Sequence, residues 1–284
     1  MKMRNFRTRS ELSSNKRMGK SVRNFIGLII LLSLTSCGCS SETNVDYSGI
    51  FEKDEDTRYL PVIGKRTVFD VDVEELSGLC LNKDKTALLS CGDQGVLKTI
   101  SFEGKVTEII EYDTDMEGVT LDPETDDIYL AIEGAQTVAK LAAPDYKDFN
   151  TVFPVQEAID NGYSNGGLEG IEFYKDDILF VGSQTEANLW QYHMDGTMIS
   201  KVSLSAFATE VAGMCYDPVD DRLWIVDSNE AELYLVTVDG KLEATYSLGK
   251  IENAESVCLD RERGCIWVGS DEYSPKLYRY EISF

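Results

Sequence analysis

Five glutamates recur along the chain, at positions 75, 117, 169, 210 and 255. Each stands at the head of a short apolar stretch, as in Met116-Glu-Gly-Val-Thr-Leu and Leu168-Glu-Gly-Ile-Glu-Phe. Aspartates follow a second apolar stretch in three of the repeats. Carboxylate oxygens without histidine or thiolate partners suit a hard divalent cation. The candidate metal ligands are therefore Glu75, Glu117, Glu169, Glu210, Glu255, Asp93, Asp227 and Asp271.

Calcium fits these ligands better than magnesium, because Ca²⁺ accepts six to eight oxygens in loose geometry whereas Mg²⁺ demands an octahedron. So many carboxylates at close range could not all stay ionised without a cation. In the alternative interpretation, each glutamate accepts hydrogen bonds from backbone N–H groups of a neighbouring repeat and binds no ion. The second acidic set, from the aspartates, favours the ion. Glu117, Glu169 and Glu255 align without gaps, whereas Glu75 and Glu210 stand further from their glycine.

Other catalytic chemistry has little support. His193 is the only histidine, which excludes zinc sites built from several histidines. The equivalent positions in other repeats are polar, so we expect His193 on the solvent face of a strand. The sequence contains no P-loop, no GxSxG and no CxxC motif.

Three of the seven cysteines, Cys80, Cys215 and Cys258, occupy one equivalent position of the repeats. This pattern indicates packing, because a free cysteine behaves as a small apolar residue. Two pairs, Cys80/Cys91 and Cys258/Cys265, could face each other across hairpins. Neighbouring strands rarely offer disulfide geometry, so we expect the thiols to be unbridged.

The repeats have a mean spacing of 45 residues, and each predicts four short strands. A turn and a fully apolar strand follow the glutamate strand, as in Leu223-Trp-Ile-Val. A third, alternating strand ends in a hairpin signal such as Asp239-Gly. Four antiparallel strands per repeat of this length are typical of a β-propeller blade. We therefore predict an all-β, five-bladed β-propeller over residues 58–284.

Two details of this propeller also follow from the spacing. The last repeat stops after its third strand, so the strand within residues 58–69 should close the last blade and remove the open edges. The spacing from Glu117 to Glu169 is 52 residues, and the surplus falls at residues 155–167. This insertion predicts a short helix or flap beside the site.

Charge excludes one class of partner. Residues 1–36 hold eight basic residues and one acidic residue, so the remainder carries a formal charge of −30. Such an acidic body repels phosphate backbones, which excludes nucleic-acid binding. With 43% hydrophobic residues in the chain, there is enough apolar side chain for a full core.

The N-terminus has the features of an export signal. Residues 25–35 are apolar but too few to span a bilayer, as in a signal peptide. They end in Leu34-Thr35-Ser36-Cys37, which resembles the lipobox of bacterial lipoproteins. By that resemblance residues 1–36 are a signal peptide, Cys37 bears the lipid, and residues 37–57 form an acidic, flexible tether. The alternative is an ordinary signal peptide or a short membrane anchor. The expected location is the bacterial cell envelope, lipid-anchored to the outer membrane, with the leaflet left open.

The acidic Glu-x-Gly repeats, the five blades and the anchored N-terminus resemble the SdiA-regulated family, a bacterial propeller group distantly related to NHL repeats. The resemblance covers about residues 58–284. It implies a five-bladed propeller with bound calcium and no established catalytic activity.

Three functions are compatible with these observations. The first is a monomeric, envelope-anchored module that binds an unknown protein or small molecule at the acidic channel mouth. The second is a metal-dependent hydrolase of the lactonase or phosphoesterase type, in which the axial cation activates water. The third is a scaffold in which the ion only stabilises the fold. The acidic mouth offers few basic groups for an anionic substrate, which weakens the phosphoesterase version most.

Overall fold

The computed structural model describes residues 59–164, 166–272 and 274–284. The predicted signal peptide (1–36), the lipid-bearing Cys37 and the predicted tether (37–57) lie outside these residues. Within the described part, no helix is long and apolar enough to span a membrane.

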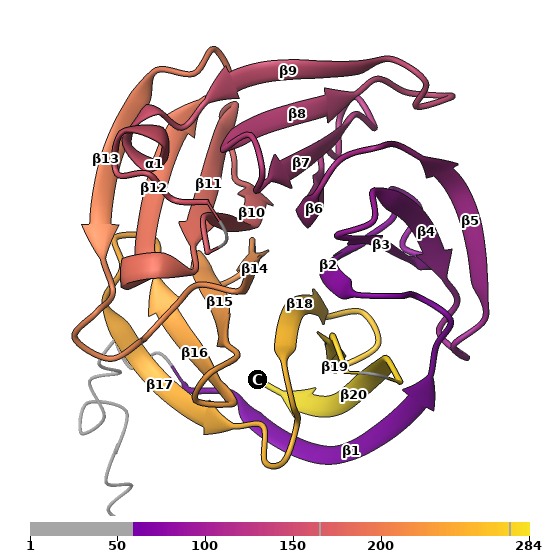
Figure 1. Cartoon of the computed structure of the whole chain (residues 1–284). Helices are drawn as coiled ribbons and strands as arrows, with labels where there is room; N and C mark the ends of the chain where they lie inside the picture. The colour runs from indigo at the N-terminus through magenta and orange to yellow at the C-terminus, as the bar shows by residue number, and fades with distance from the viewer. Residues whose placement is uncertain (1–58, 165, 273) are drawn as a thin grey trace, which may run out of the picture. The chain divides into compact units, whose positions relative to one another are not determined.

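Five four-stranded antiparallel sheets surround a central axis (Figure 1). In the first four blades, strands follow one another outward in chain order. The innermost strands are β2 (Leu76–Leu81), β6 (Met116–Leu121), β10 (Leu168–Phe173), β14 (Gly213–Asp217) and β18 (Ala254–Asp260). The second strands are β3 (Leu88–Gly92), β7 (Ile128–Ile132), β11 (Ile178–Ser183), β15 (Arg222–Asp227) and β19 (Cys265–Ser270).

The third strands are β4 (Val96–Ile100), β8 (Thr137–Leu141), β12 (Asn188–His193), β16 (Glu232–Thr237) and β20 (Lys276–Ser283). The outermost strands are β5 (Val106–Glu111), β9 (Phe149–Pro154), β13 (Met198–Ser203), β17 (Leu242–Ser247) and β1 (Val62–Asp70). The predicted five-bladed, all-β propeller is thereby confirmed.

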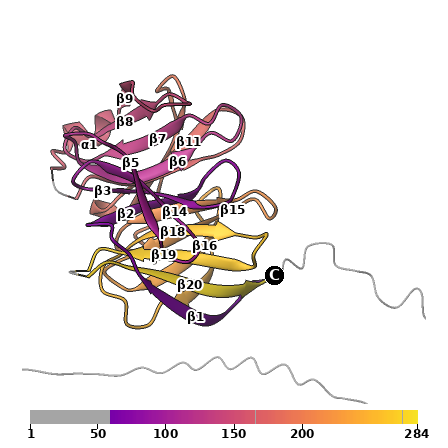
Figure 2. The ribbon, with the colours of Figure 1, turned by 90° about the vertical axis from the view of Figure 1, so that its right-hand side faces the viewer.

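The N-terminal strand closes the ring. Strand β1 pairs antiparallel with β20, from Val62 opposite Ser283 to Asp70 opposite Lys276. Figures 1 and 2 both show these two strands side by side. The prediction that the last blade takes its fourth strand from residues 58–69 is confirmed, and the strand extends one residue further.

The apolar core lies between the blades. Strands β7 and β19 are buried along their whole length, because a neighbouring blade covers each of their faces. The outermost strands consist mostly of exposed and half-buried residues, as β17 does. The side chains of Trp190, Trp224 and Trp267 are fully buried within these layers. The layered packing of the blades therefore explains why the second strands are apolar throughout and the outermost strands are more polar.

Glycine lets the inner strands approach closely at the axis. A Cβ at Gly118 would lie 2.3 Å from the carbonyl oxygen of Glu169 in the next blade. A Cβ at Gly213 would lie 2.4 Å from the carbonyl oxygen of Glu255. Gly118 and Gly213 are thus required by the contact between neighbouring inner strands.

Three smaller predictions are also confirmed. The insertion before Glu169 contains a short helix, α1 (Gln156–Asp160). The side chain of His193 is exposed at the end of β12. The five cysteines of the described part are buried and unbridged: Cys80, Cys91, Cys215, Cys258 and Cys265.

Candidate metal centre

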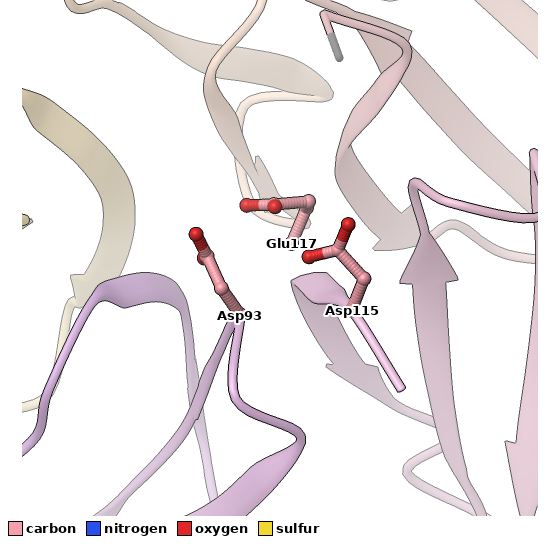
Figure 3. Close-up of side chains that lie close together, drawn as sticks. All are labelled: Asp93, Asp115 and Glu117. Carbon is pink, nitrogen blue, oxygen red and sulfur yellow. The ribbon is translucent and has the colours of Figure 1, made fainter. Parts of the chain in front are cut away.

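Numbered in chain order, the blades contain β2–β5, β6–β9, β10–β13, β14–β17 and β18–β20 with β1. Three carboxyl groups meet where blade one faces blade two. Asp93 follows β3, Asp115 precedes β6, and Glu117 lies in β6. One oxygen from each of the three lies within 4.8 Å of the others. Figure 3 shows the three side chains converging on one point. Asp93 and Glu117 are predicted ligands, whereas Asp115 was missed.

A β-bulge positions the glutamate of the inner strand. The pairing of β6 with β7 skips Glu117, since Met116 lies opposite Ile132 and Gly118 lies opposite Ala131. A bulge bends the strand and re-aims the extra side chain. The register shifts in the same way across Ser77 in β2 and Glu255 in β18, and across Glu169 and Gly170 in β10.

The inner ring therefore carries three glutamates rather than five. Glu117, Glu169 and Glu255 take equivalent places at the bulge, and Ser77 takes the same place in blade one. Glu75 and Glu210 stand before this position, as their extra distance from the glycine predicts. The structure thus separates the five sequence glutamates into three on the ring and two in the loops that enter it.

Burial strongly affects two of the ring glutamates. Loss of hydration, reinforced by the charges of Glu169, Asp93 and Asp115, raises the pKa of Glu117 to about 11. The same desolvation, together with Glu255 and Glu133, raises the pKa of Glu169 to about 10. Without a cation, both carboxyl groups hold their protons at neutral pH.

The pKa of Glu255 is raised less than those of Glu117 and Glu169. Burial raises its pKa to about 7, while a 3.0 Å hydrogen bond from Ser228 Oγ to its Oε1 opposes the shift. Its other oxygen, Oε2, is buried and has no hydrogen-bond partner among the described residues. Asp271, in the loop after β19, also has a pKa raised by burial and by Asp93. An unpaired, buried oxygen is costly unless a cation or water meets it.

Two of the predicted ligands are already satisfied by the protein. Asp227 accepts hydrogen bonds from Thr209 N at 2.7 Å, from Thr209 Oγ1 at 2.9 Å and from Glu230 N at 3.1 Å. Glu210 accepts a bond of 2.8 Å from Asn229 N. These contacts between Asp227, Glu210 and the loops of blade four are of the kind that the hydrogen-bond alternative predicts.

Glu75 occupies a special backbone position. Its φ of 52° places it in the left-handed region, directly before β2. Its carbonyl oxygen lies so close to Gly92 that a Cβ there would be only 2.4 Å away. The backbone of Glu75 therefore packs tightly against Gly92 at the end of β3, and Gly92 directly precedes Asp93.

The insertion between β9 and β10 packs directly against the site. Glu133, in the loop after β7, accepts hydrogen bonds from the backbone N–H groups of Gly166 and Gly167. Gly167 lies against the amide of Gln136, since a Cβ there would lie 1.9 Å from Gln136 Nε2. The second acidic set therefore includes Glu133, which holds the insertion in place beside the ring.

Below the acidic groups, the axis is almost closed. Glu117 and Glu169 line a void of about 10 Å³ together with the small residues Gly78, Gly118 and Gly213. A space of this size holds about one water molecule or one bare cation.

The fold and these acidic groups define a five-bladed β-propeller with a carboxylate-rich mouth on its axis. No protein-family model and no curated protein sequence matches the chain.

Solved structures with the same kind of fold do match. One is a chain of a nidogen/laminin complex, at a TM-score of 0.50 and 16% identity over 74% of this chain and 85% of that one. A Bacteroides thetaiotaomicron protein of unknown function gives 0.52 and 11%, over 80% and 77%. The Xanthomonas campestris gluconolactonase XC5397 gives 0.52 and 11%, over 78% and 91%. Identities this low establish the propeller fold alone.

Proposed function

We propose that the protein is a calcium-binding propeller that acts as a binding module at the bacterial cell envelope. The observation that carries this proposal is the convergence of Asp93, Asp115 and Glu117 within 4.8 Å of one another. The resemblance to the SdiA-regulated family and the N-terminal lipid anchor support the location, and both rest on the sequence.

The chemistry of the ligands favours calcium. The three clustered residues offer carboxylate oxygens, which hard cations prefer. Glu169, Glu255 and Asp271 lie near enough for their charges to shift one another's pKa or that of Glu117. Ca²⁺ tolerates the irregular arrangement of such residues better than Mg²⁺ does.

The raised pKa values support a cation on energetic grounds. Glu117 and Glu169 bind protons at neutral pH in the cation-free protein because their charges are buried and unpaired. A bound cation supplies the missing positive charge, so those protons leave when it binds. The unpartnered Oε2 of Glu255 is a further oxygen that such an ion could approach.

The size of the axial void argues for an ion site and against a hydrolase at this mouth. About 10 Å³ beside Glu117 and Glu169 suits an ion or a water, not an organic substrate held for attack. The gluconolactonase among the similar structures shares the fold at 11% identity, which carries no activity to this chain.

Calorimetric titration of metal-stripped protein with Ca²⁺ tests the proposal. We expect one or more ions to bind, with a melting temperature that rises in calcium and falls on chelation. At a free calcium concentration 100-fold above the dissociation constant, the gain is about 2.7 kcal/mol. Magnesium should substitute poorly.

Two ring variants and one loop variant separate ion binding from scaffolding. Glu117→Gln and Glu169→Gln keep the shape of a protonated carboxyl group, so they should weaken calcium binding at least tenfold while the cation-free protein stays folded. Glu210→Gln alters a carboxylate that accepts a loop N–H, so it should lower stability equally with and without calcium. Folded protein that takes up no calcium would contradict the proposal. Calcium-dependent lactone hydrolysis lost in Glu117→Gln would replace the binding module by the hydrolase.

A further inference from the structure

A large cavity opens at the end of the inner strands opposite the acidic mouth. Its volume is about 860 Å³, and the last residues of all five inner strands line it together with the loops that follow them. Cavities of 300–1,000 Å³ with apolar walls and a few convergent polar groups are typical sites for small organic ligands. This cavity therefore has the size of a ligand site, whereas the void beside Glu117 and Glu169 does not.

One carboxyl group lies at the floor of this cavity, in blade three. The five inner strands place equivalent residues there, two positions after the small residue of each strand: Cys80, Thr120, Glu172, Cys215 and Cys258. Four of these side chains are buried, and Glu172 alone among the five stays partly accessible. An acid at a position that holds cysteine or threonine in the other blades costs stability unless a partner compensates it. Glu172 is thus the polar group that a ligand in the cavity would meet first.

Neighbouring blades hold the Glu172 side chain in place. The hydroxyl of Thr120 in blade two donates a hydrogen bond of 3.3 Å to Glu172 Oε2 and accepts one of 3.0 Å from Phe173 N. Loss of hydration, followed by the charge of Cys215, holds the pKa of Glu172 well above its usual range, although bonds from the Tyr216 N–H and Thr120 oppose the shift. Glu172 is therefore oriented by hydrogen bonds but has no cation to pair with among the described residues.

The rim of the cavity has no positive charge to spare. Seven acidic and four basic residues line the whole cavity. Among the described residues, each of the four bases is already engaged: Lys85 pairs with Glu262, Lys175 with Asp221, Arg261 with Asp217 and Asp220, and Lys83 Nζ donates to the carbonyl oxygen of Glu124 at 3.2 Å. The lining therefore attracts cations and repels anions.

Apolar side chains form the walls between the floor and the rim. Leu81, Leu121 and Phe173 line the cavity and are only half-buried, so part of their apolar surface is free for a ligand. The rings of Tyr174 and Tyr216 also line it, and they meet edge to face with centroids 4.8 Å apart. Aromatic rings bind both apolar groups and organic cations.

We propose that the cavity binds a small organic amine, with its ammonium group against the Glu172 carboxylate and its apolar body against the walls. The ammonium group supplies the positive charge that Glu172 lacks, and the acidic lining attracts it. On binding, the Glu172 carboxyl group releases its proton to the solvent, so one proton leaves for each ammonium ion bound. The cavity and the cluster of Asp93, Asp115 and Glu117 lie at opposite ends of the inner strands, so this site does not depend on the calcium proposal.

Three fluorescent compounds of similar length and different charge test the site. Dansylcadaverine carries a primary amine, its N-acetyl derivative is neutral, and dansyl-aminocaproic acid is an anion. Dansyl fluorescence rises and shifts to the blue when the group leaves water for an apolar cavity. We expect dansylcadaverine to bind the full chain at a single site, about tenfold more tightly than the neutral compound, with the anion weakest. Neutral or anionic compounds that bind as tightly as the amine would overturn the proposal, as would no binding of any of the three.

A matched pair of variants shows whether Glu172 is the partner of the amine. Glu172→Gln keeps the shape of the protonated side chain, so it should abolish the preference for the amine over its acetyl derivative. Glu111→Gln removes one carboxylate from an exposed position on β5 and should bind dansylcadaverine like the parent. Calorimetry in buffers of different ionisation enthalpy should show one proton released per amine bound by the parent and none by Glu172→Gln. An amine preference that persists in Glu172→Gln would overturn the assignment.

Two measurements keep the proposal testable if Glu172→Gln fails to fold. Val219 lies on the lining and is 68% exposed, so Val219→Arg adds a positive charge at the rim without disturbing the core. It should weaken dansylcadaverine severalfold and leave the neutral compound unchanged. Calcium added to the parent should not displace dansylcadaverine. Equal binding of the amine by Val219→Arg and the parent, or displacement by calcium, would place the amine elsewhere and overturn the proposal.

Discussion

The Ser77 hydroxyl donates a hydrogen bond of 2.7 Å to Asp93 Oδ1 and joins the start of β2 to the loop after β3. Ser77 occupies the bulge position that holds a glutamate in blades two, three and five. In blade one, the loop thus supplies the carboxylate and the ring residue orients it. Asp93 then lies within reach of Asp115 and Glu117.

Replacing Ser77 by alanine should weaken calcium binding about tenfold. A hydrogen bond to a charged group is worth about 1.5–3 kcal/mol, and part of that loss is recovered because Asp93 is half-exposed to water. Calorimetric titration of Ser77→Ala against the exposed control Ser205→Ala checks this expectation. Equal affinities in the two variants would show that Asp93 needs no orienting partner.

The stability of the cation-free protein should fall as pH rises. The unfolded chain ionises Glu117, Glu169 and Glu255 near pH 4.5, whereas the folded protein keeps these protons up to about pH 11, 10 and 7. These three groups therefore contribute most to the free energy of unfolding below about pH 4.5. Their contribution declines as the pH rises above that value. The contribution of Glu255 is lost by about pH 7, and those of Glu117 and Glu169 decline further at alkaline pH.

Calcium should reverse this loss, because it replaces the protons. The rise in melting temperature on adding calcium should then grow from about pH 5.5 to about pH 8.5. Thermal melts in chelator and in calcium at several pH values measure it. A calcium effect of the same size at every pH would argue against carboxyl groups that release protons on binding.

Removal of the closing strand should cost far more than its length suggests. Deleting residues 57–70 takes away β1 and leaves β20 as an unpaired edge. We expect a large drop in melting temperature and a tendency to aggregate. Deleting residues 38–52, in the predicted tether, is the control and should change the melting temperature little. Similar melts for the two deletions would be inconsistent with closure through β1.

Membrane attachment should depend on Cys37. If this residue carries the lipid, Cys37→Ser should move the protein from the membrane fraction to the soluble fraction and abolish labelling by a fatty acid. Cys39→Ser is the matched control and should leave attachment intact. Fatty-acid labelling that persists in Cys37→Ser would refute the lipobox interpretation.

The architecture was predictable because each blade repeats its pattern of apolar residues. The all-apolar stretch at Ile128 reports a strand that neighbouring blades cover on both faces. The stretch at Leu233, predicted to alternate, is instead buried from Leu233 to Val236. The closing strand was predictable from the missing fourth strand of the last repeat. The strand order of the blades and the closing strand depend only on the local pattern of apolar residues and on the number of repeats.

The candidate metal centre was only partly predictable. The alignment of Glu117, Glu169 and Glu255 with a following small residue is a signal of the shared bulge. Residue type alone could not distinguish Asp227 from Asp93, although one accepts three donors from its own loop and the other joins the cluster. Asp115 was missed because the repeats were aligned on Glu117, although Glu75 and Glu210 stand at the position of Asp115, three residues before the glycine of the inner strand.

The strand that closes the ring has a consequence for biosynthesis. Val62 is among the first residues of the propeller to leave the ribosome, and its partner Ser283 is among the last. Pairing between such distant positions is slow, because the whole intervening chain must be brought together first. The first strand must therefore wait, unpaired, until four blades and the first three strands of the fifth have been made. A chaperone or the translocation machinery that keeps residues 62–70 from pairing elsewhere would thus determine how much of the protein reaches its native state.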